Sequence, residues 1–171
     1  MQLGMIGLGR MGANMVRRLQ RAGHECVGYD RSAEAAAEVA RDGIATAASP
    51  GELVRALAAP RAICIMVPAA HVDSAIEELL PLLSAGDTII DGGNSHYHDD
   101  IARAGRLRAQ GIEYVDMGTS GGVWGLERGY CLMIGGDKAA FEFLDPIFAA
   151  LAPGIGDIPR TEDRGAGHDP R

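Results

Sequence analysis

Few aromatic residues and only one lysine occur in the sequence. Aromatic side chains make up 5% of the 171 residues, so a hydrophobic core has to be built from aliphatic side chains. The single lysine is Lys138, and 16 basic against 23 acidic residues give a formal net charge of −7. Proteins that bind nucleic acids present a basic stripe to the phosphate backbone. The sequence therefore argues against a nucleic-acid partner.

Long apolar runs and cysteine pairs are missing as well. No stretch approaches the ~18 apolar residues of a membrane span, and no basic leader followed by an apolar segment opens the sequence. We therefore expect a cytoplasmic protein without a membrane partner. Cys26, Cys64 and Cys131 form no C-x-x-C pair, and their odd number favours buried, reduced thiols over a disulfide framework.

Glycine is abundant, with 24 residues, which is about twice its usual share. Hydrophobic residues make up 47% and charged residues 23%, close to the usual globular mix. A chain of 171 residues is long enough for one domain with a core of its own. We place this domain at residues 1–156. Residues 157–171 lack apolar periodicity, so we expect a disordered tail there.

Strand-like and helix-like patterns alternate along the sequence. Apolar strands are expected at 2–6, 26–29, near 44, 61–67, 87–91, 113–117 and 130–134. Helices are expected at 11–21, 32–41, from 49 onward, 72–83, 97–109 and 137–150. The strand at 63–67 is apolar throughout rather than alternating, as expected when helices cover both faces of a sheet. This order predicts an α/β fold with a doubly wound, mostly parallel sheet.

A glycine-rich turn follows the first predicted strand. Its residues fit the pattern G-x-G-x-x-G and are Gly7, Leu8, Gly9, Arg10, Met11 and Gly12. The position between a strand and a helix is what gives this pattern its specificity. Gly7 permits a tight turn, Gly9 lets a diphosphate approach the backbone, and Gly12 lets the helix pack closely. Together with the positive end of the helix, the turn predicts a Rossmann-type dinucleotide site.

An acidic residue at the end of the second strand completes this pattern. Asp30 lies 18 residues after Gly12, near the ~20 expected. A carboxylate there accepts hydrogen bonds from the adenosine ribose hydroxyls and repels a 2′-phosphate. The neighbouring Arg31 complicates the assignment, because a guanidinium could pair with that phosphate or stack on adenine. We expect NAD as the cofactor, with NADP less favoured.

Three further turns follow predicted strands, at the edge of the sheet where ligands bind in open α/β folds. Val67 and Pro68 are small and stiff enough to form a wall beside the nicotinamide half. The turn at 91–95 carries Asn94, which offers both a donor and an acceptor. The turn at 118–122 offers hydroxyls and open amides that suit a carboxylate or sugar hydroxyls. Each turn taken alone could equally be an ordinary polar connection.

Several motifs carry a family resemblance. They are residues 4–12 with 14–15 and 23–24, 90–95 with 97 and 99, 119–126, and 129–136. The first group resembles the opening of the β-hydroxyacid dehydrogenases. The second, with 120–122, resembles 6-phosphogluconate dehydrogenase, and the last two stretches resemble the short, NAD-preferring bacterial branch of that family. The resemblance covers about residues 1–160.

This resemblance implies oxidative decarboxylation of 6-phosphogluconate to ribulose 5-phosphate, a step of the pentose phosphate pathway. The substrate loses a proton to a base and a hydride to the nicotinamide, then carbon dioxide, and the enediol is protonated. Candidate substrate contacts are Asn94, which would position the substrate, Ser120, Gly121 and Gly122. Candidate cofactor contacts are Gly7, Leu8, Gly9, Arg10, Met11, Gly12, Asp30, Arg31, Val67, Pro68 and Asn94.

The sequence departs from the family pattern near its end. In the family the base is a lysine and the acid a glutamate, both beyond the nucleotide domain, and the lysine belongs to a G-A-G-H-F-V-K stretch that opens a helical domain. Residues 165–168 begin in the same way, but Asp169, Pro170 and Arg171 follow and end the sequence. We therefore expect the helical domain to be absent and turnover to be impaired. A helical partner domain or a homo-oligomer stays possible.

Other interpretations stay open. The chain could be a sister hydroxyacid dehydrogenase for a three- or four-carbon acid, or a non-catalytic NAD-binding module or partner-dependent subunit. Asp116 is expected to be a turn acid rather than a base, and Trp124 to lie in the core or an interface.

A metal site is not expected. The candidate ligands His96, His98, Asp99 and Asp100 alternate along a predicted helix start capped by Ser95, so they do not converge on one face.

Overall fold

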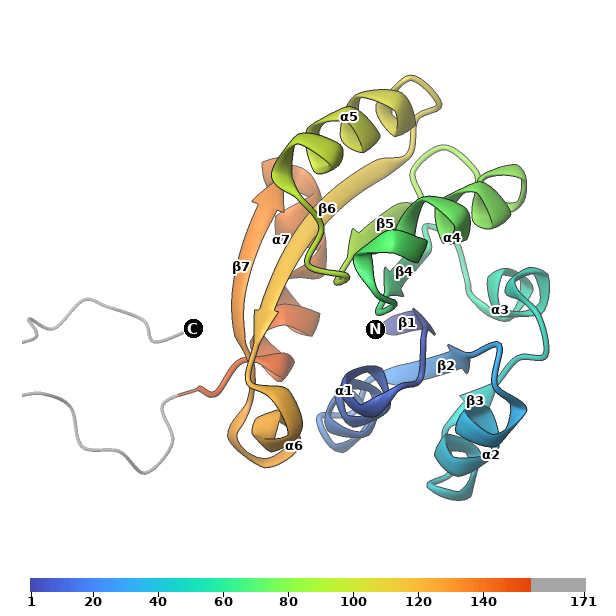
Figure 1. Ribbon diagram of the computed structural model, residues 1–171, viewed down its shortest axis with the longest axis vertical. Coiled ribbons are helices and arrows are strands. Elements are labelled where there is room, and N and C mark those ends of the chain that lie inside the picture. Colours follow the sequence, from blue (N-terminus) through green and yellow to red (C-terminus); the bar gives the residue numbers. More distant parts are fainter. Residues whose placement is uncertain (155–171) are drawn as a thin grey trace, which may run out of the picture.

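A computed structural model describes residues 1–154 of the chain (Figure 1). The strands are β1 Gln2–Ile6, β2 Glu25–Tyr29, β3 Ala45–Thr46, β4 Ala62–Ile65, β5 Thr88–Asp91, β6 Glu113–Ser120 and β7 Cys131–Gly136. The helices are α1 Arg10–Arg21, α2 Ala33–Arg41, α3 Pro50–Ala56, α4 Val72–Leu79, α5 Tyr97–Arg108, α6 Gly125–Arg128 and α7 Lys138–Leu151. The predicted domain boundary at 156 and the predicted tail at 157–171 lie outside the described residues.

The strands form a single sheet in the order β3-β2-β1-β4-β5-β6-β7. All neighbouring strands pair in parallel except β6 and β7, which are antiparallel. The predicted Rossmann-type, doubly wound and mostly parallel sheet is therefore confirmed. The chain moves outward from β1 on one side through β2 and on the other through β4. The carboxyl ends of β1 and β4 thus border the crevice in which such sheets bind ligands.

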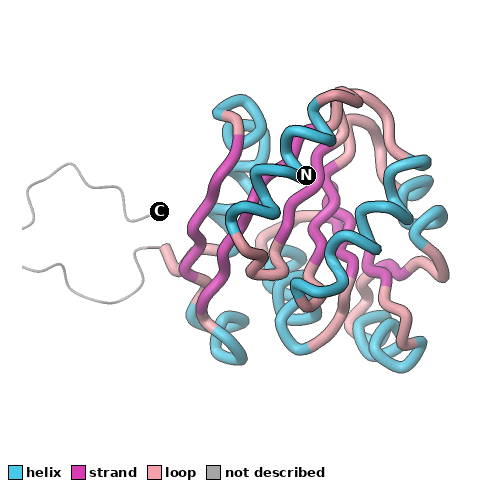
Figure 2. Tube along the Cα trace, turned by 45° about the horizontal axis from the view of Figure 1, so that its top comes forward, coloured by secondary structure: helices cyan, strands magenta, loops and turns pink. Residues whose placement is uncertain are grey.

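Helices lie on both sides of the sheet (Figure 2), and an apolar layer on each face holds them there. Helices α1, α2 and α7 contribute to one layer, and α3, α4 and α5 to the other. Strand β4 supplies both, since Ala62 and Cys64 face the first layer while Ile63 and Ile65 face the second. Alternate residues of a strand point to opposite faces, so a strand buried on both faces is apolar at every position.

Local sequence sets several helix boundaries. The hydroxyl of Ser32 accepts a hydrogen bond from the backbone N–H of Ala35, at 3.3 Å, and caps α2. Ser49 caps α3 in the same way, with Pro50 at its first turn. The predicted helix at 72–83 was too long. Helix α4 ends at Leu79 and a 3₁₀ turn over Leu80–Leu82 follows, because Pro81 has no N–H to continue the α-helical pattern.

Two of the three cysteines are buried. Cys26 and Cys64 are buried as expected, whereas Cys131 is exposed, so the prediction of a buried thiol was wrong there. Cys131 opens β7, which has a neighbour on one side only and therefore leaves part of its side chains uncovered.

Within residues 1–154, no helix has the length and apolar character needed to cross a membrane.

A buried ion pair ties the amino ends of β4 and β5 together. Asp87 is 1% exposed and accepts hydrogen bonds from the Arg61 backbone N–H at 2.8 Å, the Ser84 N–H at 2.9 Å and the Arg61 guanidinium at 2.9 Å. Burial by itself would raise the pKa of Asp87, but these donors outweigh it and hold the pKa below its ordinary value of 3.8. The charged carboxylate is therefore the form that the fold stabilises.

We expect Asp87→Asn to lower the free energy of unfolding by about 2–4 kcal/mol at neutral pH, because it leaves a largely buried guanidinium without its anion. Asp42→Asn is the matched control: Asp42 pairs with Arg17 but is 43% exposed, so its loss should cost less than about 1 kcal/mol. Denaturant unfolding measures both.

The same substitution should change the acid sensitivity of the fold. A folded-state pKa below 3.8 means that Asp87 stabilises the protein above that pH, and that this contribution is lost as the pH falls through the folded-state pKa. Asp87→Asn should therefore have a smaller effect in strong acid than at neutral pH. An effect of equal size at both would contradict the role assigned to the charge.

Candidate functional site

The glycine turn after β1 is packed tightly at two of its three glycines. Gly7 has a φ of +95°, and a Cβ there would lie 2.5 Å from the carbonyl oxygen of Met66. A Cβ on Gly12 would overlap the carbonyl oxygen of Gly7. Only glycine fits both conditions without moving the backbone. The turn is therefore held against α1 on one side and the end of β4 on the other.

Gly9 differs from Gly7 and Gly12, because no packing contact within residues 1–154 requires a glycine there. It has a φ of −62° and precedes α1, and a Cβ would meet no atom within 4 Å. The first turn of α1 contains no acidic residue and receives no side-chain cap. Its N–H groups therefore keep their hydrogen-bonding capacity and the positive end of the helix is not neutralised. This open space fits the diphosphate of a dinucleotide.

Asp30 lies beside this turn, at the end of β2. One of its carboxylate oxygens accepts a hydrogen bond from the Leu8 N–H and the other from the Ser32 N–H, each at 2.7 Å. The carboxylate thus joins the end of β2 to the glycine turn. Each oxygen retains further acceptor capacity, which suits the hydroxyls of a ribose.

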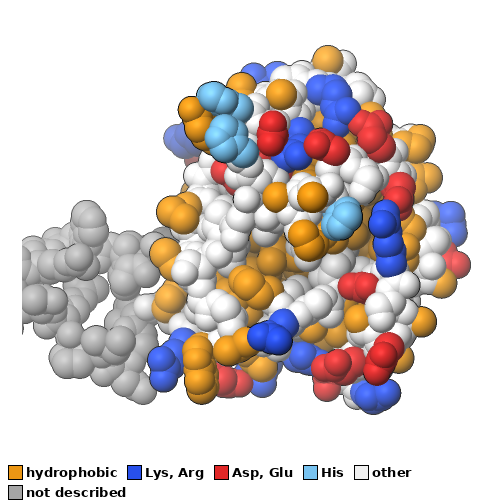
Figure 3. All heavy atoms as spheres, in the orientation of Figure 1, with side chains coloured by type: hydrophobic (Ala, Val, Ile, Leu, Met, Phe, Trp, Pro, Cys, Tyr) orange, Lys and Arg blue, Asp and Glu red, His pale blue; other side chains and the backbone are white. Residues whose placement is uncertain are grey.

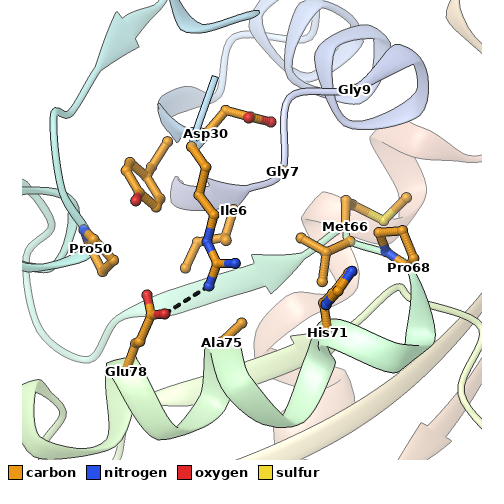
Figure 4. Close-up of a pocket in the computed structure, with 13 residues that line it drawn as sticks. Ile6, Gly7, Gly9, Asp30, Pro50, Met66, Pro68, His71, Ala75 and Glu78 are labelled. Carbon is orange, nitrogen blue, oxygen red and sulfur yellow. Dashed lines mark hydrogen bonds and ion pairs between the residues drawn. The ribbon is translucent and has the colours of Figure 1, made fainter. Parts of the chain in front are cut away.

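A cavity of about 260 Å³ opens beside the glycine turn (Figure 4). Its lining comes from the ends of three adjacent strands, from the start of α3, from the segment that leads into α4, and from α4 itself. The predicted cofactor residues Gly7, Gly9, Asp30, Arg31, Val67 and Pro68 all line it. On the face of the molecule shown in Figure 3, apolar side chains occupy the centre and charged ones lie mostly around the edge.

The other predicted residues of the glycine turn do not line this cavity. The Leu8 side chain is 3% exposed and packs over Gly28, and Met11 packs against the core. Arg10 is exposed at the start of α1. Leu8 can therefore reach a ligand only through its backbone, whereas the Met11 side chain is partly exposed.

Asn94 lies in the turn after β5, in a conformation that non-glycine residues seldom adopt. Its φ is +54°, and its side-chain oxygen accepts a hydrogen bond from the Thr119 N–H in β6, at 3.1 Å. Its side-chain NH₂ has no partner among residues 1–154, so it remains able to donate. Asn94 does not line the cavity beside the glycine turn, and the structure links it instead to the neighbours of Ser120.

The predicted turn at 118–122 is partly strand. Strand β6 extends to Ser120, so Gly118, Thr119 and Ser120 pair with β7 rather than forming a loop. The sequence missed this because Gly118 and the glycines that follow Ser120 have weak strand preference, and pairing with β7 decides the outcome. Gly121 and Gly122 do leave the strand, with φ values of +140° and +51°.

A buried carboxylate holds the turn that carries Asn94. Asp91 is fully buried at the end of β5. One oxygen accepts a hydrogen bond from the Gly93 N–H at 2.8 Å, and the other accepts from the Ser95 hydroxyl at 2.8 Å. The predicted cap by Ser95 was therefore wrong: residue His96 precedes α5 and makes no side-chain cap. The Asp91 carboxylate instead binds Gly93 and Ser95, the residues on either side of Asn94.

Two side chains that sequence reasoning missed complete this cluster. The Arg103 guanidinium lies 3.2 Å from Asp91 and 3.4 Å from Asp100, and binds Asp73 through two hydrogen bonds. The Tyr114 hydroxyl lies 2.7 Å from Asp91 and 2.8 Å from Asp100. Burial and the negative charge of Asp91 raise the pKa of Asp100, although the hydrogen bond from Tyr114 opposes them.

These distances limit the protons in the cluster. A hydroxyl has one hydrogen, so Tyr114 can donate to Asp91 or to Asp100 but not to both. Both carboxylates therefore crowd around the same hydroxyl, and burial together with the charge of Asp91 raises the pKa of Asp100. The buried cluster thus holds the Asn94 turn through Asp91, which bonds to Gly93 and Ser95 on one side and to Arg103 and Tyr114 on the other.

The comparisons with known proteins agree with this geometry. A family model for the NAD binding domain of 6-phosphogluconate dehydrogenase matches residues 2–158. The chain belongs to this family. Its members are oxidoreductases with an NAD(P)-binding domain of this fold, so the predicted family is confirmed. The roles of the individual site residues stay predictions.

Two curated relatives show how much of such proteins the chain represents. It is 45% identical to an NAD(+)-dependent, decarboxylating 6-phosphogluconate dehydrogenase of Haloferax volcanii, over 98% of this chain and 56% of that protein. It is 43% identical to the decarboxylating enzyme of Treponema pallidum, over 88% of this chain and 32% of that protein. The chain thus spans about half or less of the length of these relatives.

Two solved structures contain a part with the same fold as this chain. The Plasmodium falciparum 6-phosphogluconate dehydrogenase superimposes with a TM-score of 0.86 and 30% identity, covering 93% of this chain and 36% of that one. A 3-hydroxyisobutyrate dehydrogenase of Salmonella typhimurium superimposes with a TM-score of 0.79 and 29% identity, covering 88% of this chain and 53% of that one.

Asp116 offers a test of the electrostatics at this edge of the sheet. It lies within β6, directly beside Asp91 in β5, so its prediction as a turn residue was wrong. Burial, and then the negative charges of Asp100 and Asp91, raise the pKa of Asp116 to about 6. The folded protein therefore binds this proton more tightly than the unfolded chain, and stability falls as the pH rises from 3.8 to about 6.

We expect Asp116→Asn to raise the free energy of unfolding by about 1 kcal/mol near pH 7.5, where it removes a repelled charge, and by much less near pH 4. Urea unfolding at the two pH values provides the measurement. A variant that is destabilised near pH 7.5, or equally stabilised at both, would show that the charge of Asp116 is not repelled.

Proposed function

We propose that the chain is the coenzyme-binding part of a decarboxylating 6-phosphogluconate dehydrogenase that prefers NAD. The observation that carries the proposal is the open space over Gly9 at the start of α1, beside the cavity at the ends of β1, β2 and β4. The glycines on either side are required by the protein's own packing, whereas Gly9 leaves room for a ligand.

The residues of the cavity divide into three roles. The backbone N–H groups at the start of α1, over Gly9, hold the diphosphate, and Asp30 accepts hydrogen bonds from the adenosine ribose. Val67 and Pro68, just after β4, form the wall beside the nicotinamide. The bound nicotinamide supplies a hydride acceptor. The protein's part in this is to orient the ring and to exclude water from one side of it.

The substrate lies at the ends of β5 and β6 in this proposal. The free NH₂ group of Asn94 donates to a substrate oxygen, and its side-chain carbonyl keeps it in place through Thr119. Ser120 supplies a hydroxyl, and the backbones of Gly121 and Gly122 lie open beside it. The Asp91 cluster positions Asn94 without contacting the substrate.

The preference for NAD rests on Asp30 and on the relatives. A carboxylate at the ribose repels a 2′-phosphate. The Haloferax volcanii relative is named as NAD(+)-dependent. The Plasmodium falciparum structure was solved in complex with NADP+, and that protein is less similar to this chain, at 30% identity. A role as a different β-hydroxyacid dehydrogenase is less well supported, since the 3-hydroxyisobutyrate dehydrogenase superimposes less closely.

Gly9→Ala tests the cradle directly. We expect at least about tenfold weaker binding of NAD+, because the added methyl group occupies the space of the diphosphate. The free energy of unfolding should change by less than about 1 kcal/mol, since no protein atom lies near that methyl group. Calorimetric titration and thermal unfolding provide the two measurements.

Gly105→Ala is the matched control for this variant. Gly105 lies in α5, and a Cβ there also meets no atom within 4 Å. This substitution should leave NAD+ binding unchanged. Undiminished NAD+ binding by Gly9→Ala, or no binding of NAD+ by the folded wild-type chain, would overturn the proposed function.

Turnover by the 171-residue chain is a separate expectation. The resemblance assigns the base to a lysine, but Lys138, the single lysine, lies at the start of α7 with its side chain 87% exposed and paired with Glu142. A missing general base removes about 10²–10⁴ in rate. We therefore expect NAD+ binding with little NADH formed from 6-phosphogluconate. Turnover at an ordinary enzymatic rate would contradict this expectation.

A further inference from the structure

An ion pair crosses the mouth of the coenzyme cavity (Figure 4). The Arg31 guanidinium, just after β2, donates a hydrogen bond to the carboxylate of Glu78 in α4, with the nitrogen and oxygen 2.8 Å apart. Both residues line the same cavity as Gly9 and Asp30. The pair therefore connects the strand end that receives the adenosine ribose with the helix on the opposite wall.

Arg31 is the side chain best suited to bind a phosphate in this cavity. Its guanidinium presents a planar fork of donors that matches phosphate geometry. The other ionisable side chains in the lining are two carboxylates, Asp30 and Glu78, the phenol of Tyr29 and the imidazole of His71. A phosphate on the adenosine 2′-oxygen would therefore need Arg31 as its partner.

Glu78 opposes the binding of a 2′-phosphate to Arg31 in two ways. Its carboxylate already accepts a hydrogen bond from one nitrogen of the Arg31 guanidinium, so a 2′-phosphate has to compete for that donor and for the charge of Arg31. It also adds a second negative charge to that of Asp30 on the cavity lining, which repels a phosphate dianion. An adenosine with a free 2′-hydroxyl meets neither obstacle, because it carries no charge there.

We propose that Glu78 is a specificity-determining residue, which disfavours coenzymes with an adenosine 2′-phosphate by holding Arg31 and by its own charge. This inference rests on the proposed coenzyme function. The side chains of Arg31 and Glu78 are 64% and 47% exposed, so solvent weakens their interaction. Glu78 therefore contributes a moderate factor, and Asp30 keeps its own effect when Glu78 is changed.

A merely structural ion pair would behave differently. If Glu78 only fastened the end of β2 to α4, its removal would weaken or leave unchanged the binding of all adenosine ligands together. A specificity role changes the ratio between two ligands that differ only in the 2′-phosphate. The test therefore compares 2′,5′-ADP with 5′-AMP, and NADP+ with NAD+.

The experiment is calorimetric titration of the wild-type chain and of Glu78→Gln with these four ligands at low ionic strength. We expect Glu78→Gln to bind 2′,5′-ADP and NADP+ about 5- to 20-fold more tightly, with 5′-AMP and NAD+ changed by less than about twofold. The gain should shrink as salt is added, because it arises from charge.

Two further variants distinguish the release of Arg31 from a general change in net charge. Glu77→Gln removes the same charge one residue away, where the side chain pairs with Arg106 of α5 and does not line the cavity, so it should leave both ratios unchanged. The double variant Arg31→Gln/Glu78→Gln should lose most of the gain in affinity for 2′,5′-ADP and NADP+, since the released guanidinium is absent. An equal gain in Glu77→Gln would reduce the effect to net charge and overturn the inference.

The outcomes separate this inference from the proposed function. Wild-type protein that binds neither NAD+ nor 5′-AMP would overturn the proposed function, and the inference with it. Wild-type protein that binds NAD+, together with an unchanged 2′,5′-ADP to 5′-AMP ratio in Glu78→Gln, would overturn the inference alone. A changed ratio in Glu78→Gln but not in Glu77→Gln supports both.

Discussion

Close packing of three backbone segments around Gly7 and Gly12 is the constraint on which the site depends. The carbonyl oxygen of Met66 approaches one of these glycines, and the carbonyl oxygen of Gly7 approaches the other, so β1, β4 and α1 meet without an intervening side chain. This contact brings the positive end of α1 to the crevice between β1 and β4. Gly9 then lies over open space, where an anion can reach the backbone.

Carboxylates that accept backbone hydrogen bonds hold the other turns in place. Asp30 joins the glycine turn to the end of β2, and Asp91 shapes the turn that carries Asn94. Asp87 does the same at the opposite ends of the strands, away from the site. Burying a charge costs free energy unless donors surround it, and N–H groups at strand ends supply such donors. The same residue type therefore serves stability at one edge of the sheet and ligand binding at the other.

Features that depend on neighbours in the sequence were predictable. The glycine turn spans six residues, and its tight turn and its helix start are both local, so pattern and spacing were sufficient to locate it. The helix caps at Ser32 and Ser49 are local for the same reason. Ser95 had the same appearance, but His96 occupies the position before α5, so Ser95 lies one residue too early to cap the helix and its hydroxyl donates to the buried Asp91 instead.

The sequence by itself determined the fold class, the order of the strands and of all helices except the short α6, and the position of the glycine turn, because each of these follows from periodicity and short-range backbone chemistry. Only the tertiary structure decided that Arg103 and Tyr114 converge on Asp91, and that Glu78 meets Arg31 across the cavity. These partners lie between 12 and 47 residues apart and belong to different elements. Strand order and helix docking place them together, and no local pattern encodes that arrangement.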